Sequence, residues 1–334
     1  MKYYILDLSP HNSLVRYLVG QGHTVYVISW KNPEAGDRDL GLEDYRRFGV
    51  MEALDAVGRD SGATRINACG YCLGGTLLAI AAAAMARDHD ARLASLTLLA
   101  AQVDFTEPGE LSLFIDESEA SFLEATMWSQ GYLDTRQMAG AFQLLRSNDL
   151  IWSRRLRHYL LDLPDQHTEL MAWNADATRM PYRMHSDYLR RLFLNNDLAS
   201  ARYQVDGRPV ALADIEAPIF AVGTRTDHVA PWRSVYKIGL HSDVETSFLL
   251  TSGGHNAGVV APPGGTGRSY QIATRAPDAP YIDPERWQQE TPVHEGSWWT
   301  AWEHWLARQA GPLVDPPPMP AGLGPAPGEY VLAP

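Results

Sequence analysis

Strand-like and helix-like segments alternate along the first hundred residues, and this alternation limits the possible folds more than any other feature of the chain. β-Branched and aromatic residues predict strands at 23–30, 64–72 and 93–104. Apolar residues at helical spacing predict helices at 11–22, 42–62 and 74–90. Since the strands are largely apolar on both faces and helices separate them, the pattern predicts an α/β fold with a mostly parallel sheet.

The alternation stops near residue 105 and resumes near residue 215. Helix-like pieces without convincing strands fill the interval, after which a strand at 217–227, a helix at 232–240, a strand at 243–255 and a helix at 296–311 follow. We therefore expect four parts along the chain. They are a first core part (1–104), a helical cap inserted between two strands (105–214), a second core part (215–310) and a Pro-rich extended tail (311–334).

Composition excludes several classes of protein. The 334 residues carry a formal net charge of −12, which argues against a nucleic-acid binder. Two cysteines do not make a disulfide framework, and His, Cys, Asp and Glu do not fall at zinc spacing, so we expect no metal. No run of about 20 apolar residues predicts a membrane span, and the N-terminal segment is not typical of a signal peptide. We expect a cytoplasmic protein.

The stretch Gly70-Tyr71-Cys72-Leu73-Gly74 follows the pattern G-x-nucleophile-x-G at a predicted strand-to-helix junction. Such a nucleophile elbow lifts the central side chain off the sheet, and the flanking glycines relieve backbone crowding. The N-terminus of the following helix favours a thiolate and binds a developing oxyanion. We predict Cys72 as the nucleophile and the N–H of Leu73 as the first oxyanion donor.

Cys69 and Cys72 also form a C-x-x-C pair, which is typical of redox dithiols and of zinc sites. A redox pair places both cysteines in the first helical turn, whereas Cys69 falls inside the predicted strand. We therefore expect Cys69 to be a buried small hydrophobe in the sheet.

A nucleophile needs a base and a group that orients the base. Asp227 ends the predicted strand at 217–227, and His255 follows the next strand behind two glycines. The order nucleophile, acid, histidine is that of the α/β-hydrolase fold. We predict a Cys72–His255–Asp227 triad, and we regard His228, next to Asp227, as badly placed to be its histidine.

These residues lie in segments that resemble class I polyhydroxyalkanoate synthases along essentially the whole chain. The segments are KYYILDLSPHNSLVRYLVGQGHTVYVISWKNP, GYCLGGT, WNADATRMP, GTRTDHVAPW, SGGHNAGV, GSWWTAW and PAPGEYV. A Cys elbow in place of Ser and the D-H-x-x-P-W segment separate this family from ordinary lipases. The resemblance implies an acyltransferase that polymerises (R)-3-hydroxyacyl-CoA and releases CoA through a Cys72 acyl-enzyme.

The resemblance also implies roles for other residues. His255 would deprotonate Cys72, and either His255 or Asp227 would activate the 3-hydroxyl. No cofactor is implied, because coenzyme A is part of the substrate. The partners implied are the growing polyester chain, the granule surface and a second copy in a homodimer. Short acyl chains are favoured by analogy alone.

Several further residues draw attention. Arg190 matches a recurrent arginine of the family and is the candidate for CoA binding, whereas the cluster at 154–157 is better explained as a solvated helix face. The helical spacing of Trp298, Trp302 and Trp305 predicts core packing. The Gly-rich segment at 262–270 predicts a flexible loop rather than a phosphate loop.

The chain departs from the family at its start. Family members carry an N-terminal domain and a hydrophobic strand that precede the segment at 2–8. In the α/β-hydrolase order, that strand lies between those predicted at 23–30 and 64–72. Either residues 3–8 fill its place or the chain is a truncated product. Two alternatives to the synthase follow: an inactive homologue that binds granules or synthases, and a thioesterase-like hydrolase on the same triad.

Overall fold

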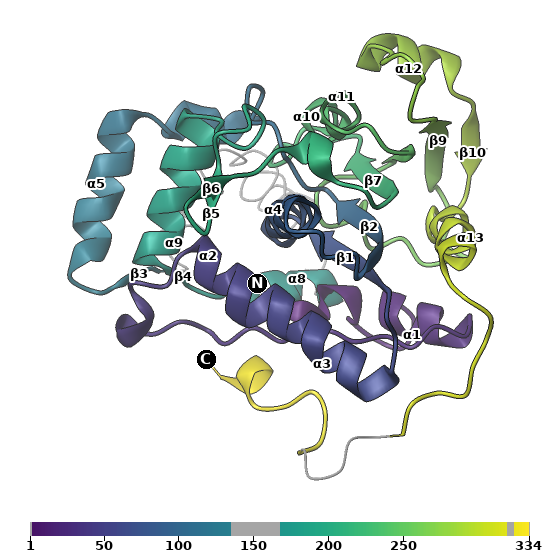
Figure 1. Ribbon diagram of the computed structural model, residues 1–334, viewed down its shortest axis with the longest axis horizontal. Helices are drawn as coiled ribbons and strands as arrows, with labels where there is room; N and C mark the ends of the chain where they lie inside the picture. Colours follow the sequence, from purple (N-terminus) through teal and green to yellow (C-terminus); the bar gives the residue numbers. More distant parts are fainter. Residues whose placement is uncertain (1, 135–167, 319–323, 334) are drawn as a thin grey trace, which may run out of the picture.

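A six-stranded sheet forms the centre of the computed structural model, which describes residues 2–134, 168–318 and 324–333 (Figure 1). The strand order is β1-β2-β7-β8-β9-β10. The strands are β1 (Ile66–Tyr71), β2 (Leu93–Leu99), β7 (Ile219–Thr224), β8 (Thr246–Thr251), β9 (Ser269–Arg275) and β10 (Val293–Glu295). The first four are parallel, and β9 and β10 are antiparallel to their neighbours. The carboxyl ends of the four parallel strands therefore meet at one edge of the sheet.

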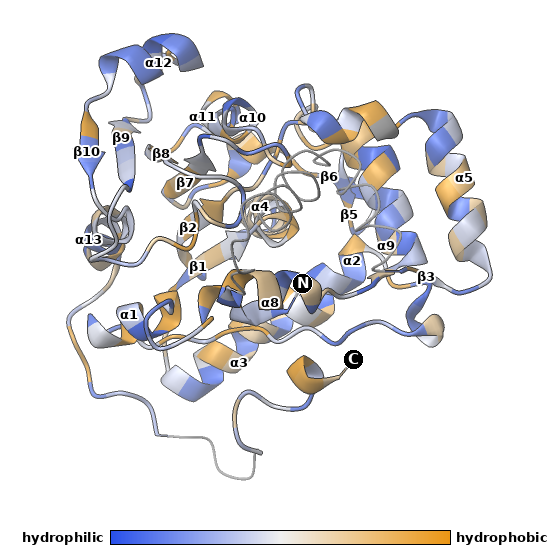
Figure 2. Ribbon diagram, turned by 180° about the vertical axis from the view of Figure 1, so that it is seen from behind, coloured by the Kyte–Doolittle hydropathy of each residue, from blue (hydrophilic) through white to orange (hydrophobic). Residues whose placement is uncertain are grey.

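Helices cover both faces of this sheet. One face packs against α4 (Leu73–Arg87), α10 (Trp232–Tyr236) and α11 (Ile238–His241), and the other against α1 (Leu14–Gly20) and α13 (Trp299–Gln309). Side chains of β7 alternate between the two apolar clusters, with Ile219 and Ala221 in one and Phe220 and Val222 in the other. Figure 2 shows β2 largely in the orange of hydrophobic residues. The predicted α/β class is confirmed.

The tryptophans near the C-terminus behave as predicted. Trp298, Trp302 and Trp305 are each at most 2% exposed and pack in the apolar cluster beneath β2, β7 and β8. Their indole rings supply much of the apolar area that this face of the sheet removes from water.

Helical segments dominate the part predicted as a cap. Its described helices are α5 (Glu117–Trp128), α8 (Glu169–Ala175), α9 (Tyr182–Asp187), the π-helix η6 (Tyr188–Leu194) and the short η4 (Glu110–Phe114) and η7 (Leu212–Asp214). Two small antiparallel sheets accompany them: β3 (Tyr132–Leu133) pairs with β4 (Met180–Pro181), and β5 (Gln204–Val205) forms a hairpin with β6 (Arg208–Pro209). Figures 1 and 2 place α5 and α9 at one end of the molecule and β9 and β10 at the other. Arg154, Arg155 and Arg157 lie outside the described residues.

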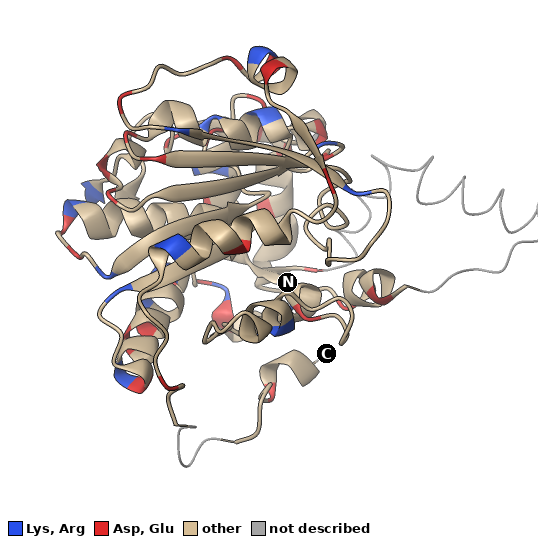
Figure 3. Ribbon diagram, turned by 90° about the vertical axis from the view of Figure 1, so that its right-hand side faces the viewer, with Lys and Arg blue, Asp and Glu red and all other residues tan. Residues whose placement is uncertain are grey.

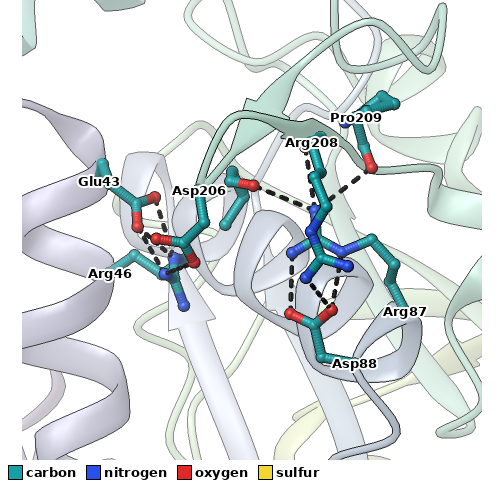
Figure 4. Close-up of polar contacts among 8 residues, drawn as sticks. Glu43, Arg46, Arg87, Asp88, Asp206, Arg208 and Pro209 are labelled. Atoms are coloured by element: carbon teal, nitrogen blue, oxygen red, sulfur yellow. Dashed lines mark hydrogen bonds and ion pairs between the residues drawn. The ribbon is translucent and has the colours of Figure 1, made fainter.

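An ion-pair network holds the β5–β6 hairpin against the core (Figure 4). Arg87, at the end of α4, donates to the carbonyl oxygens of Val205 and Arg208 at 3.1 and 2.9 Å. Arg208 in turn reaches Asp88 Oδ1 at 2.5 Å. On the hairpin's other side, Arg46 pairs with Asp206 at 2.9 Å, which joins the hairpin to a second helical stretch.

That helical stretch confirms the helix predicted at 42–62, with one difference. It is divided into α2 (Leu42–Tyr45), the π-helical η3 (Arg46–Met51) and α3 (Glu52–Ser61). A Cβ at Gly49 would lie 2.3 Å from the Trp30 ring, so the ring packs directly on the backbone of the π-helical turn. The sequence pattern contained no sign of this local widening.

The strand predicted at 23–30 is wrong. Those residues form no strand, and Tyr26, Val27 and Ile28 are 37–42% exposed. Residues 3–6 form the 3₁₀-helix η1 (Tyr3–Leu6), so they do not fill the place beside β1 either. β1 is consequently an edge strand, and strand propensity at 23–30 finds no ladder to join.

The position of β1 also overturns the prediction for Cys69. Its side chain is exposed rather than buried, because the outer edge of β1 carries no neighbouring strand within the described ranges. The prediction that Cys69 is a buried hydrophobic residue assumed that its strand is paired on both sides.

The sequence patterns did not predict two strands of the central sheet, nor the short strands β3 to β6. β9 begins at Ser269, inside the segment predicted as a loop, and pairs with both β8 and β10. β10 itself follows the short helix α12 (Pro284–Glu290). Residues 262–268 form no helix or strand, as expected. Near the other end of the chain, the tail closes with η8 (Tyr330–Leu332), and Lys2 donates to the carbonyl oxygens of Val331 and Ala333.

Charged residues lie mainly on helices and loops, whereas the sheet is drawn almost without them (Figure 3). Across the described ranges, no helix combines the length and the apolar character that crossing a bilayer requires.

Candidate active site

Cys72 occupies a strained turn between β1 and α4. Its backbone has φ 54° and ψ −129°, a conformation that a non-glycine residue rarely adopts. The N–H of Cys72 donates to the carbonyl oxygen of Leu99 at 2.9 Å, which fastens the turn to β2. The thiol thus stands at the carboxyl end of β1, at the edge where the parallel strands end.

Two glycines permit the close approach of β1 and α4. Gly70 was predicted to do so, but the second one is Gly75 and not the predicted Gly74. A Cβ at Gly70 would lie 2.5 Å from Gly75 Cα, and one at Gly75 would lie 2.4 Å from Ala101 Cβ. A Cβ at Gly74 would meet nothing within 4 Å. The turn therefore requires Gly70 and Gly75, and Gly74 is not needed to relieve crowding.

The first turn of α4 points its backbone N–H groups toward the elbow. The carbonyl oxygen of Cys72 accepts hydrogen bonds from Gly75 at 2.9 Å and Thr76 at 3.2 Å. Leu73 is the first residue of the helix, where an N–H has no intrahelical acceptor. This donor and the positive end of the helix dipole suit a negative charge beside Cys72.

Asp227 lies three residues after β7 with its carboxylate fully buried. Oδ1 accepts the N–H groups of Val229 and Ala230 at 2.8 and 2.9 Å. Oδ2 accepts the hydroxyl of Thr224 at 2.8 Å and contacts His255 Nδ1, also at 2.8 Å. Four donors thus fix the carboxylate and compensate its removal from water.

The imidazole of His255 lies between Asp227 and Cys72. Its Nε2 is buried and has no hydrogen-bond partner of normal geometry in the described part of the chain. Burial alone would lower the pKa of His255. The charge of nearby Cys72 and the hydrogen bond that Nδ1 donates to Asp227 outweigh this effect and raise the pKa of His255 to about 10. The imidazole is therefore set up to take and hold a proton beside Cys72.

The loop that carries His255 is held from two sides. A Cβ at Gly258 would lie 2.6 Å from Thr224 Cγ2, so this glycine lets the loop approach the one that bears Asp227. From the other side, Trp298 Nε1 donates to the Gly258 carbonyl and Trp299 Nε1 to the Val259 carbonyl, both at 2.9 Å. Trp298, one of the predicted core tryptophans, thereby also anchors the histidine loop, together with its neighbour Trp299.

Two other predicted residues lie in separate ion pairs. His228 Nδ1 contacts Glu110 Oε1 at 2.9 Å, and the Asp227 carboxylate bonds His255 instead. Arg190 donates to Glu124 Oε1 at 2.6 Å and to Glu117 Oε2 at 2.7 Å. These carboxylates raise the pKa of Arg190 and occupy the guanidinium that was predicted to bind CoA.

An aromatic group near the thiol was not predicted. Tyr188, at the start of the π-helix η6, stacks edge-to-face with Phe193 and Phe105 at ring-centroid distances of 5.0 and 6.1 Å. Burial and, to a smaller extent, the charge of Cys72 raise the pKa of Tyr188. No local motif marks Tyr188, because only the folding of the inserted segment over the sheet brings it there. π-Helical turns are common at functional sites.

The geometry suits nucleophilic acyl transfer. A thiol on a strained turn, an imidazole that can take its proton, a buried carboxylate behind the imidazole and a helix N-terminus for an oxyanion are the parts this chemistry requires. Within the described residues, His, Cys, Asp and Glu form no group of three or more that could hold a metal ion.

Comparison with known proteins agrees with this fold. Residues 6–262 match the family model described as the alpha/beta hydrolase fold. The chain belongs to the α/β hydrolase fold family.

Several curated proteins are similar to this chain over almost its whole length. The chain is 42% identical over 335 residues to a poly(3-hydroxyalkanoate) polymerase of Methylorubrum extorquens, covering 99% of this chain and 55% of that protein. The polymerase subunit PhaC of Rhizobium meliloti is 40% identical (99% and 54% covered), and PhaC of Cupriavidus necator is 37% identical (99% and 58% covered). The chain thus spans a little over half the length of the curated relatives it matches.

Proposed function

We propose that this chain carries the catalytic site of an acyltransferase that polymerises (R)-3-hydroxyacyl-CoA into a polyester and releases CoA. The observation that carries the proposal is a cysteine at the elbow beside a His255–Asp227 pair, in a chain similar to named poly(3-hydroxyalkanoate) polymerases. A cysteine suits this reaction, because exchange between thioesters is nearly thermoneutral and the acyl-enzyme keeps its reactivity. A serine ester would be a poorer donor for chain growth.

In the first half-reaction, the Cys72 thiol gives its proton to His255 Nε2, and the sulfur attacks the thioester carbonyl carbon. The N–H of Leu73 donates to the resulting oxyanion. The bond from carbon to the CoA sulfur breaks, and the leaving thiolate takes the proton back from His255. The product is a Cys72 thioester and free CoA, with no cofactor required.

In the second half-reaction, the 3-hydroxyl of a hydroxyacyl unit attacks another acyl thioester and forms the ester bond of the polymer. We assign removal of the hydroxyl proton to His255 rather than to Asp227. Support comes from the Asp227 carboxylate, which is fully buried and already accepts three hydrogen bonds in addition to its contact with His255. The proton on His255 then passes to the departing sulfur, which closes the cycle.

Polymer growth on the enzyme also suggests where the protein resides. A polyester chain held on Cys72 would keep the protein at the surface of an insoluble granule, and we propose that surface and a homodimer as its partners. Co-sedimentation with polyester particles and the mass of the protein in solution test these two statements separately.

The test is thiol release from (R)-3-hydroxybutyryl-CoA by the purified chain, measured beside Cys72→Ala and the matched control Cys69→Ala. We expect sustained release and insoluble polyester, abolished by Cys72→Ala and retained by Cys69→Ala, because Cys69 lies on the exposed edge of β1. Release without polymer would identify a thioesterase instead. Release that survives Cys72→Ala would mean that another residue is the nucleophile.

A further inference from the structure

The residues next to the nucleophile and the histidine contact each other directly. Tyr71, which precedes Cys72, donates its phenolic O–H to Asn256 Oδ1 at 2.5 Å, and Asn256 follows His255. The same hydroxyl lies 3.4 Å from the carbonyl oxygen of His255. The rings of Tyr71 and His255 are 5.3 Å apart, with an interplanar angle of 36°.

This contact joins the elbow that carries Cys72 to the loop that carries His255, which are otherwise held by different elements. Cys72 is fastened to β2 through Leu99, whereas the histidine loop is fastened to Thr224 and α13. Apart from the contact between Cys72 and His255 themselves, the hydrogen bond from Tyr71 to Asn256 is the main polar link between 70–74 and 253–258 among the residues that the structure describes. The separation between Cys72 Sγ and His255 Nε2 therefore depends on this link more than on either anchor.

Both members of the link are themselves held in place. The Tyr71 ring packs with Ile5, Trp173 and Val260 in a small apolar cluster. The backbone carbonyl of Asn256 accepts the N–H groups of Val259 and Val260 at 3.1 and 3.0 Å. Burial and the neighbouring charges of Cys72 and Asp227 hold the pKa of Tyr71 well above its ordinary value, so the phenol stays a donor.

We propose that Tyr71 and Asn256 are positioning residues that set the distance from the Cys72 thiol to the His255 imidazole, and with it the fraction of Cys72 present as thiolate. Tyr71 acts through the His255 loop and touches no reacting atom. The inference rests on the triad of the proposed function. A purely structural role would instead stabilise the fold and leave the reactivity of the folded site unchanged.

The experiment measures alkylation of Cys72 by iodoacetamide against pH in a Cys69→Ser background, which leaves one thiol. Tyr71→Phe and Asn256→Leu are compared with Tyr26→Phe, a matched control whose hydroxyl bonds Asp60 at the surface. Each site variant should lower the rate at pH 7 by about fivefold, the equilibrium factor of one hydrogen bond. The pH of half-maximal rate should rise, and the urea midpoint should stay close to that of the parent.

Coupling between the two residues gives the second criterion. The double variant should lose no more than the larger single loss, because either substitution breaks the same link. Unchanged pH profiles, or losses that multiply in the double variant, would overturn the proposal. If one variant fails to fold, the other carries the same test, since the two remove opposite ends of one hydrogen bond.

Turnover separates this inference from the proposed function. With (R)-3-hydroxybutyryl-CoA, Tyr71→Phe should lower kcat and leave KM nearly unchanged. Alkylation needs no substrate, so it tests the link even if the parent releases no CoA. A parent that releases no CoA while its alkylation responds to Tyr71→Phe would refute the proposed function and retain this inference.

Discussion

At the scale of single residues, the glycines of the elbow differ in what they must do. Gly70→Ala would place a Cβ 2.6 Å from the Gly74 carbonyl oxygen and still closer to the Gly75 backbone, which cannot move without shifting α4. We expect this substitution to cost about 3 kcal/mol of unfolding free energy, in the range of overpacking. Gly74→Ala, whose Cβ meets nothing, should stabilise the chain by about 0.5 kcal/mol through helix propensity. Urea unfolding of both variants measures the difference.

Equal losses for the two substitutions would contradict the crowding at Gly70.

The residues of the elbow and the triad also differ in how far the sequence alone predicts them. Cys72, Asp227 and His255 follow from a local motif and from chain order, because each falls just after a strand. The need for Gly75 rather than Gly74, and the approach of Tyr188, depend on how closely α4 and the inserted segment pack on the sheet. No local pattern records those distances.

At the scale of elements, Arg87 at the end of α4 and Arg46 on the helical stretch beside it both hold the β5–β6 hairpin. The Arg87 side chain is 13% exposed and donates to backbone carbonyls of the hairpin, whereas the Arg208 side chain is 60% exposed and forms a surface pair with Asp88. Arg87→Ala should lower the unfolding free energy by about 2 kcal/mol, as for hydrogen bonds from a charged donor. Arg208→Ala should change it by less than about 1 kcal/mol. Guanidinium denaturation checks both values.

If Arg208→Ala proved as costly as Arg87→Ala, the surface pair and not the carbonyl bonds would hold the hairpin.

Elements also differ in how well sequence predicts them. The strands β2, β7 and β8 are buried at every residue and largely apolar, as buried parallel strands require. Residues 23–30 carry the same propensity but have no ladder partner, and β9 alternates polar with apolar residues between Gly-rich and Pro-rich flanks. Strand pairing is non-local, so strand propensity alone wrongly predicted a strand at 23–30 and did not predict β9.

At the scale of the whole molecule, Asp104 joins three parts of the chain. It lies beyond β2, and its carboxylate contacts His241 Nε2 of α11 at 2.9 Å and accepts from Asn196 Nδ2 at 3.1 Å. The Thr106 hydroxyl and N–H complete the set at 2.7 and 2.9 Å. One buried carboxylate therefore connects the sheet, the second core part and the segment that follows η6.

This junction predicts how stability depends on pH. Burial would raise the pKa of Asp104, but hydrogen bonds from His241 and Thr106 and the charge of Lys237 hold it well below its ordinary value. A carboxyl with a depressed folded pKa stabilises the protein above its unfolded pKa near 3.9, and the stabilisation disappears as pH falls through the folded value. Asp104→Asn should therefore cost about 2 kcal/mol at pH 7, and the gap to the parent should narrow below pH 4. Urea midpoints between pH 7 and pH 3 measure that gap, with Asp39→Asn, 85% exposed, as the control. A gap that stays constant down to pH 3 would mean that Asp104 acts by packing, since only the loss of its charge on protonation makes the difference depend on pH.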